Sequence, residues 1–482
     1  MSETIFDKSR EGRRGTKLPP CDVEAKFSLN DNLKRKTKAK LPSLSEFDVI
    51  RHFTNLSSKN FSIDKNFYPL GSCTMKYNPK IAERVAALPG FNSLHPHLIS
   101  NGQEDHFQGA LEMLTTLKEY LCAVTGMSAF TTTPQAGAHG EMLGIMMIDK
   151  YHRDRGNKKK YVIVPDSSHG TNPATAAMIG YDVITIPSDE NGYMDIEAFK
   201  AKMSDEVAAV MLTVPNTLGI FNQKIKELCE IAHSYDALMY YDGANLNAIM
   251  GVVRPGDIGF DVMHINVHKT YATPHGGGGP GSGPVGVGEK LKPYLPDLDV
   301  ECSGNGYKLT NGGEKAIGKI SPFFGNFAIS LRAITYMMVL GKEGMENATK
   351  KAVLNANYIR VRLRGHLDIP YDKICMHECV LSAKTLLKEH GVSAMDIAKY
   401  LIDFDMHAPT VYFPLTVKES IMIEPTETEN KETLDKFCDR MIEAVKLAKS
   451  DPKAFSEYPK TLGVCRPNDT KAVQELNVRA TL

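Results

Sequence analysis

Short apolar runs and amphipathic stretches alternate through the middle of the chain. The apolar runs are rich in Val, Ile, Met and Tyr and end at turn or polar residues: YVIVPD (161–166), DVITIP (182–187), VAAVMLTVP (207–215), ALMYYDGAN (237–245) and DVMHINVHK (261–269). The stretches between them place apolar residues three and four positions apart, which is typical of helices. Apolar strands separated by helices indicate βαβ units, so we predict a mostly parallel sheet that is covered on both faces.

The two ends of the chain follow different patterns. Residues 1–75 are mainly polar and charged, and DNLKRKTKAKLPSLSE predicts an arm or linker followed by a helix capped near Ser45. From about residue 345 amphipathic helices alternate with two strand-like runs, PTVYFPLT and SIMIEPT. We therefore predict an α/β protein with an N-terminal segment (1–75), a large domain (76–340) and a smaller α+β C-terminal domain with a tail (341–482).

Composition narrows the classes of protein. The 57 Lys and Arg residues balance the 57 Asp and Glu residues, so no net field attracts nucleic acid or an acidic membrane. The basic runs at 34–40 and 157–160 are expected to be solvated. No apolar run approaches the ~20 residues of a membrane span, and the first residues lack a signal-peptide core. Nine scattered cysteines suit a reducing compartment, so we expect a cytoplasmic protein that binds neither membranes nor nucleic acid.

One cysteine–histidine motif raises the question of a metal. Cys375-Met-His377-Glu-Cys379 places three candidate ligands close together. No second ligand pair follows at the spacing of a zinc site. We interpret this motif as structural and expect no metal.

Reactive side chains follow the ends of successive predicted strands. His169 follows the first run, Asn216 and Thr217 follow the third, Asp242 ends the fourth and Lys269 ends the fifth. In open parallel sheets ligands bind outside the carboxyl ends of the strands. Each residue taken alone is more simply a surface or turn residue, but together they predict a single site.

The chemistry that needs this combination is that of pyridoxal phosphate. Its aldehyde condenses with a lysine amine, its ring nitrogen needs a carboxylate partner, and an imidazole can stack on the ring. The phosphate needs an anion site, and TTTPQAGAHGEMLGIMMIDKY (131–151) predicts a Gly/Ala turn that opens a helix with free N–H groups.

Two other interpretations of the glycines do not fit the sequence. A P-loop needs GK[ST] after its glycines, and GGGGPGSGP has none. A dinucleotide fingerprint needs a helix after its glycines, but PVGVGEKL predicts another short strand. These glycines either let the backbone approach the cofactor and a neighbouring subunit, or form a merely flexible loop.

Longer motifs are similar to those of a known family. The motifs are FYPLGSCTMKYNP (67–79), PDSSHGTNPATAAM (165–178), YYDGANLNAI (240–249), HKTYATPHGGGGPGSGPVGV (268–287) and MIEPTETE (422–429). The sequence resembles glycine decarboxylase, the P-protein of the glycine cleavage system, from about residue 60 to 465. This resemblance implies the type I pyridoxal-phosphate-dependent transferase fold. Because members occur as one double-length chain or as two half-length subunits, this chain resembles subunit 2 of the two-subunit form.

The resemblance assigns roles to the predicted site residues. Lys269 is expected to bind the cofactor covalently, Asp242 to pair with its ring nitrogen and His169 to stack on the ring. We count these three as the catalytic residues.

Other residues are expected to hold the rest of the cofactor. Backbone N–H groups of Gly137, Ala138 and His139 are expected to bind the phosphate, with help from Thr217. Asn216 is a candidate for the hydrogen bond to the ring hydroxyl.

The candidates for binding the glycine carboxylate are Ser72 and Thr74 of the GSCTMK loop and His275 after the lysine. Each is equally well explained as part of its loop. Cys73 is either a redox-sensitive thiol or, more simply, a packed side chain.

The resemblance also implies a reaction and partners. Glycine would lose CO2, and its aminomethyl group would pass to the lipoyl arm of the H-protein. A homologous subunit 1 would complete an α2β2 enzyme. An aminotransferase or cysteine desulfurase, which would share the same lysine, aspartate and histidine, is the alternative function; a cofactor-free scaffold is a second.

Overall fold

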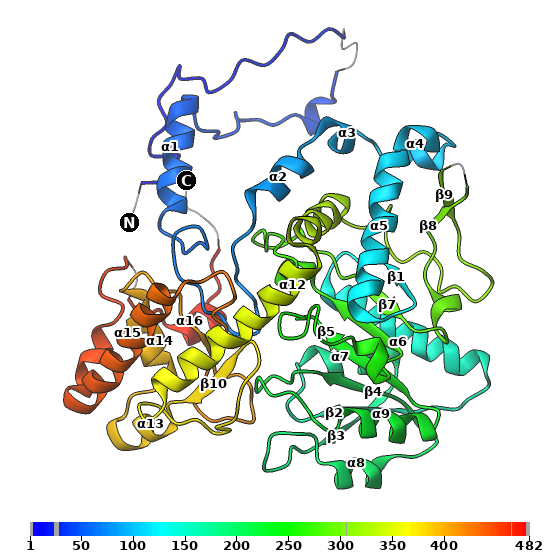
Figure 1. Cartoon of the computed structure of the whole chain (residues 1–482). Coiled ribbons are helices and arrows are strands. Elements are labelled where there is room, and N and C mark those ends of the chain that lie inside the picture. The colour runs from blue at the N-terminus through cyan, green and yellow to red at the C-terminus, as the bar shows by residue number, and fades with distance from the viewer. Residues whose placement is uncertain (1–2, 24–27, 305, 464, 479–482) are drawn as a thin grey trace.

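The computed structural model describes residues 3–23, 28–304, 306–463 and 465–478. A large lobe contains a seven-stranded sheet, and a small lobe contains a three-stranded sheet with three helices. Figure 1 shows the lobes side by side, with the N-terminal segment (blue) running along the outside. Among the described residues, no helix is both long and apolar enough to cross a bilayer.

The sheet of the large lobe has the strand order β1-β7-β6-β5-β4-β2-β3. Strands β2 to β6 pair in parallel, whereas β7 is antiparallel to both β1 and β6. The strands are β1 (Ala129–Thr131), β2 (Tyr161–Pro165), β3 (Asp182–Ile186), β4 (Val207–Thr213), β5 (Leu238–Gly243), β6 (Val262–Ile265) and β7 (Val285–Val287). The predicted, mostly parallel sheet is confirmed.

Helices cover both faces of this sheet, and they are α5 (Gln108–Thr125), α6 (Gly137–Asp154), α7 (Thr171–Ile179), α8 (Ile196–Lys202) and α9 (Ile225–Ser234). Alternate residues of a strand enter different cores: Tyr240 packs with α6, and Tyr241 packs with α5 and α9. Strands buried on both faces need apolar residues at every position. This requirement explains the unbroken apolar runs in the sequence. Gly144 lets α6 approach the sheet, since a Cβ there would lie 2.4 Å from the Tyr240 ring.

The long helix α12 (Phe327–Leu363) runs from the large lobe to the small lobe (Figure 1). Gly341, with φ 63° and ψ −175°, interrupts its helical geometry. The small lobe has the antiparallel order β10-β12-β11 and a core of its own. Its elements are β10 (Cys379–Ser382), α13 (Lys384–His390), α14 (Ala394–Ile402), β11 (Thr410–Val411), β12 (Ser420–Ile423) and α15 (Lys431–Ser450). The expected α+β character is confirmed; the domain boundaries at 75 and 340 stay predictions.

Further helices and one hairpin complete the described fold. Ser45 caps α1 through a capping box with Asp48, as expected. The other helices and strands are α1 (Glu46–Ser57), α2 (Lys80–Ala86), α3 (Pro89–Asn92), α4 (His97–Ser100), α10 (Pro255–Ile258), α11 (Val267–Thr270), the hairpin β8 (Asp299–Cys302) and β9 (Tyr307–Thr310), and α16 (Asp469–Gln474). The 3₁₀ helices are Asp31–Leu33, Glu104–Phe107, Lys292–Tyr294 and Pro452–Glu457.

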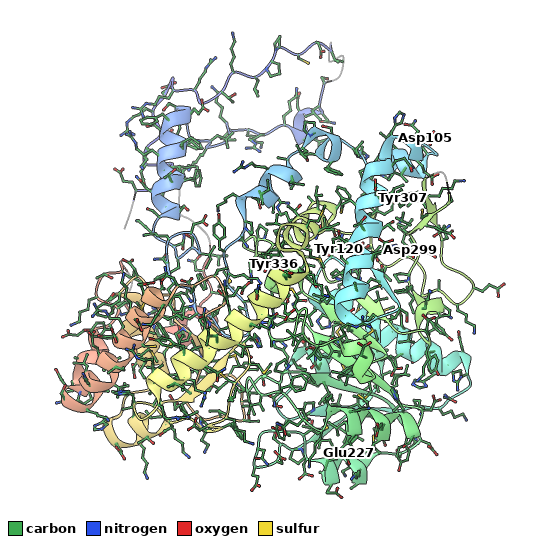
Figure 2. All side chains as sticks on the ribbon, viewed as in Figure 1. Asp105, Tyr120, Glu227, Asp299, Tyr307 and Tyr336 are labelled. Atoms are coloured by element: carbon green, nitrogen blue, oxygen red, sulfur yellow. The ribbon has the colours of Figure 1, made fainter. Side chains whose placement is uncertain are left out.

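The segment before α2 joins the two lobes. Phe67 and Leu70 form bridges with the small lobe. Lys76, which is fully buried, pairs with Glu427 at 2.8 Å and donates to Asn247 at 2.9 Å and to Tyr336 at 3.2 Å. Tyr336 projects from α12 near the junction of the lobes (Figure 2). This segment therefore fixes the lobes relative to each other.

Replacing Lys76 by methionine is expected to lower the free energy of unfolding by about 3–5 kcal/mol, because Glu427 would stay buried without its cation. Thermal or denaturant unfolding measures the loss. Lys80→Met is the matched control, since its pair with Asp64 is half exposed and is expected to contribute less than about 1 kcal/mol. Equal losses in the two variants would contradict this account.

Candidate active site

A cavity of about 220 Å³ opens at the carboxyl ends of the parallel strands. Its walls come from the start of α6, from the loops after β2, β4, β5 and β6, and from two segments that touch the small lobe, around Ser72 and around Glu378. The topology of the sheet explains this position, because ligands of open parallel sheets bind where loops from several strands converge.

Lys269 lies on α11, the single helical turn that follows β6. Its side chain lines the cavity and is partly buried. The Lys269 amine forms no hydrogen bond or ion pair with any residue that the structure describes. A lysine amine inside a cavity without a partner is free to react with a carbonyl compound.

Asp242, at the end of β5, is fixed by three donors. Asn172 Nδ2 donates to it at 3.0 Å, the backbone N–H of Ala244 donates at 3.1 Å, and His264 Nε2 lies 3.5 Å away. Burial alone would raise the pKa of Asp242, but His264, Asn172, Ala244 and Lys269 outweigh burial and lower this pKa. The carboxylate is therefore ionised at neutral pH and suits a protonated ring nitrogen.

The supporting residues of Asp242 were missed by the sequence argument. His264 lies directly opposite Asp242 on the neighbouring strand, and Tyr240 shares a 2.7 Å hydrogen bond with His264 Nδ1. Asn172 also donates to Glu141 at 3.1 Å. The sequence carried no local signal for His264, because its place beside Asp242 depends on the register between β5 and β6.

The helix predicted to bind an anion at its start is α6, which begins at Gly137. The extended residue Ala136 precedes the helix, and the N–H groups of Gly137, Ala138 and His139 have no acceptor among the described residues. Gly137 and Ala138 line the cavity, whereas His139 does not. The His139 imidazole instead accepts a hydrogen bond from the Gln135 N–H at 3.3 Å.

His169 and Thr217 also line the cavity. The exposed His169 ring contacts Thr171 Oγ1 at 2.9 Å and meets the Phe413 ring edge-on, with the ring centres 5.9 Å apart. Thr217 Oγ1 donates to the carbonyl of Ser167 at 2.6 Å. Its hydroxyl oxygen can still accept a hydrogen bond.

Asn216 lines the cavity but uses its amide to hold its own loop. Its Nδ2 donates to the Gly192 carbonyl at 2.7 Å, and its Oδ1 accepts from the N–H groups of Leu218 and Ile220. These contacts within the loop are enough to account for an asparagine at this position. One hydrogen of the Asn216 amide is still available to the predicted ring hydroxyl.

The candidates for the substrate carboxylate differ in their relation to the cavity. Ser72 lines the cavity, whereas Thr74 and His275 do not. His275 Nε2 is buried without a partner, and burial followed by the charge of Lys269 lowers its pKa. Burial raises the pKa of the Cys73 thiol, which favours the packed side chain over the redox-sensitive thiol.

The cysteine–histidine motif needs a correction. Cys375 and Cys379 are buried, and burial raises the pKa of both thiols, to about 12 for Cys375. They are structural, as interpreted. His377 and Glu378, however, line the cavity, and the interpretation of the whole motif as structural overlooked them.

The chain's residues fit pyridoxal phosphate. The cavity offers an unpartnered amine, an ionised carboxylate and free N–H groups in one place. Two further lining atoms, Thr213 Oγ1 and Asn266 Oδ1, are buried without a hydrogen-bond partner. Buried polar atoms without partners are rare, so these two are available to a polar ligand.

Replacing Gly137 by alanine is expected to weaken binding of pyridoxal phosphate by about 1–3 kcal/mol, the usual effect of overpacking. The new Cβ would lie 1.7 Å from Asn266 Oδ1 and displace the start of α6. Titration of the apoenzyme with the cofactor measures the affinity. Gly109→Ala on α5, where a Cβ meets nothing within 4 Å, is the control; the same affinity in both variants would refute the predicted phosphate site.

Comparison with known families assigns most of the chain. The family described as Glycine cleavage system P-protein matches residues 23–303. The family described as Glycine dehydrogenase, C-terminal domain, matches residues 348–454.

Curated relatives are similar over almost the full length. The relative from Staphylococcus saprophyticus subsp. saprophyticus is 50% identical over 98% of this chain and 96% of its own. The relative from Caldanaerobacter subterraneus subsp. tengcongensis is 51% identical over 99% of this chain and 98% of its own. The relative from Thermotoga maritima is 50% identical over 97% of this chain and 98% of its own. Each is named probable glycine dehydrogenase (decarboxylating) subunit 2.

Solved structures agree on the fold. A crystal structure of glycine decarboxylase (P-protein) of the glycine cleavage system, in inhibitor-bound form, gives a TM-score of 0.69 at 20% identity, covering 85% of this chain and 92% of that one. A cysteine desulfurase from Escherichia coli gives a TM-score of 0.59 at 15% identity, and the match covers 82% of this chain and 98% of that one. The fold is that of type I pyridoxal-phosphate enzymes, as predicted. With family and relatives matching almost from end to end, the chain belongs to the P-protein family of the glycine cleavage system.

Proposed function

We propose that this chain is the cofactor-bearing subunit of a glycine decarboxylase, which releases the carboxyl group of glycine as CO2 and transfers the aminomethyl group to a lipoyl disulfide. The names of the relatives at 50–51% identity support this proposal. The observation that carries it is the unpartnered Lys269 amine in the same cavity as the ionised Asp242.

When bound, pyridoxal phosphate supplies a protonated ring that takes up the electron pair left by the breaking bond at the α-carbon. Lys269 would hold the aldehyde of the cofactor. Asp242 would keep the ring nitrogen protonated, and the first N–H groups of α6 would hold the phosphate. These groups are fixed before the substrate arrives, so the chain orients the breaking bond without reorganising its own dipoles.

The partners and the location belong to the same proposal. The words "subunit 2" in the relatives' names support a homologous subunit 1 and an α2β2 enzyme. A lipoylated H-protein would supply the disulfide, and its arm would have to enter the cavity. A cytoplasmic location stays a prediction.

Exchange of labelled bicarbonate into the carboxyl group of glycine tests the proposal. The subunit is assayed with pyridoxal phosphate, its partner subunit and lipoylated H-protein, and exchange with glycine but not with alanine or glutamate is expected. Transamination, or release of sulfur from cysteine, without glycine exchange would favour the alternative enzymes. The 15% identity to the desulfurase shows only a shared fold.

A further inference from the structure

Two glutamates meet at the wall of the cavity that faces the small lobe. In the small-lobe sheet Cys379 on β10 lies opposite Ile423 on β12. Glu378 and Glu424 lie one residue beyond these positions, so the antiparallel register brings them together. Both are buried, at 3% and 1% exposure, and Glu378 lines the cavity with Lys269.

The two carboxyl groups have unequal surroundings. Glu424 accepts hydrogen bonds from Thr74 N–H at 3.1 Å, Thr74 Oγ1 at 2.6 Å and Asn245 Nδ2 at 3.0 Å, with Asn247 Nδ2 at 3.4 Å. Glu378 accepts a single hydrogen bond, from the Ser72 N–H at 2.9 Å, among the described residues. Four of the five hydrogen bonds that the described residues donate to this pair therefore go to Glu424.

The proton of this pair therefore belongs on Glu378. Two carboxylates in one buried site cannot both be ionised. Burial, followed by the charge of Glu424, raises the pKa of Glu378 well above its usual range, against the smaller effects of Ser72 and Lys269. His377 Nε2 lies 3.9–4.0 Å from both carboxyl groups, and burial lowers its pKa, so it remains a neutral neighbour. Glu378 is a neutral carboxylic acid facing the cavity.

The proposed reaction consumes a proton. Glycine loses CO2, and the electron pair of its broken C–C bond forms a new C–S bond with one sulfur of the lipoyl disulfide. The S–S bond breaks, so the disulfide is reduced, and the second sulfur leaves with an electron pair that must be protonated to give a thiol. This inference rests on the proposed function, because only that acceptor creates the demand for a proton.

We propose that Glu378 donates this proton to the leaving sulfur. The Glu378 O–H bond breaks, an S–H bond forms, and the resulting carboxylate takes a proton from solvent before the next turnover. In the described cavity wall Glu378 is held neutral beside Lys269, whereas Asp242 is held ionised. The third carboxyl group of the wall, Glu141, accepts a hydrogen bond from Asn172 at 3.1 Å.

Infrared spectroscopy of the holoenzyme tests the protonation state without an assay of activity. At pH 8.5 the C=O stretch of a protonated carboxylic acid is expected in the wild type and should disappear in Glu378→Gln. Glu429→Gln is the matched control. Burial raises the pKa of Glu429 only to about 7, and its side chain lies outside the cavity. Its removal is expected to leave the band at pH 8.5 unchanged.

Kinetics test the role in transfer. With H-protein as acceptor, Glu378→Gln is expected to turn over at least roughly 100-fold more slowly, the usual contribution of a general acid, whereas Glu429→Gln keeps the wild-type rate. In Glu378→Ala, imidazolium in the buffer is expected to restore turnover in proportion to its concentration. A purely structural role would not respond to a small acid.

The outcomes separate this inference from the proposed function. A wild-type enzyme without glycine–bicarbonate exchange would refute the function itself. An active wild type without the infrared band, or a Glu378→Gln variant at the wild-type rate, would refute the role of Glu378 alone. A stoichiometric divalent cation in the purified holoenzyme would also refute it, because His377, Glu378 and Glu424 offer ligand atoms within 4.8 Å of one another and a metal would keep both carboxylates ionised. If Glu378→Gln does not fold, the wild-type band and the Glu378→Ala rescue decide.

Discussion

Replacing Lys269 by alanine is expected to abolish covalent binding of pyridoxal phosphate and to lower glycine decarboxylation by at least about 10³-fold. The Lys269 amine is the one that lines the cavity without a partner among the described residues. Its task is to hold the aldehyde covalently, and the variant loses this positioning of the reacting group. Reduction with borohydride followed by peptide mass analysis should find the label on residue 269 in the wild type and nowhere in the variant.

Borohydride labelling also shows whether Lys269 is wrongly assigned as the residue that binds the cofactor. Lys319→Ala is the control, because Lys319 is exposed and does not line the cavity. It should keep both the visible absorbance of the bound cofactor and the turnover. A label on another lysine in the wild type would contradict the proposed site. Cofactor absorbance that survives in Lys269→Ala would contradict covalent binding at this residue.

The elements of the large lobe could be predicted because each is marked by the apolar pattern of its own segment of the chain. The inner parallel strands β2, β4, β5 and β6 are buried on both faces, so YVIVPD and VAAVMLTVP are apolar at almost every position. Asp242 and Lys269 could be placed in one site for the same reason, since each follows a strand of one sheet and the carboxyl ends of parallel strands share an edge. The antiparallel pairing of β7 was beyond this argument, because a three-residue apolar run carries no direction.

The residues that the sequence argument missed depend on contacts distant in sequence. Glu378 and Glu424 meet through the register of an antiparallel sheet in the small lobe, and Ser72 joins them from 306 residues away in the sequence. His264 supports Asp242 only because β5 and β6 pair in one particular register. Strands β5 and β6 are buried along their whole length, and runs that are buried on both faces do not by themselves specify a register.

Replacing Asp242 by asparagine is expected to leave Lys269 able to bind pyridoxal phosphate but to lower turnover by roughly 10²–10³-fold, the usual effect of removing one charge-stabilising group from a preorganised site. The asparagine is nearly isosteric but carries no negative charge for the ring nitrogen. Its amide group would also face the Asn172 amide, which now donates to Asp242. The affinity for the cofactor and the turnover should therefore separate, with the larger change in turnover.

Asn172→Ala tests whether the charge of Asp242, rather than its shape, is what matters. Asn172 is one of the groups that lower the pKa of Asp242. Without this hydrogen bond the pKa should rise, so the carboxylate should be lost at a higher pH as the solution is acidified. The acid limb of the pH–rate profile is expected to move to higher pH in Asn172→Ala and to be absent in Asp242→Asn. If Asp242 acted only by filling space, Asp242→Asn would keep the wild-type turnover, because the two side chains have nearly the same volume. Asn172→Ala would then not move the acid limb.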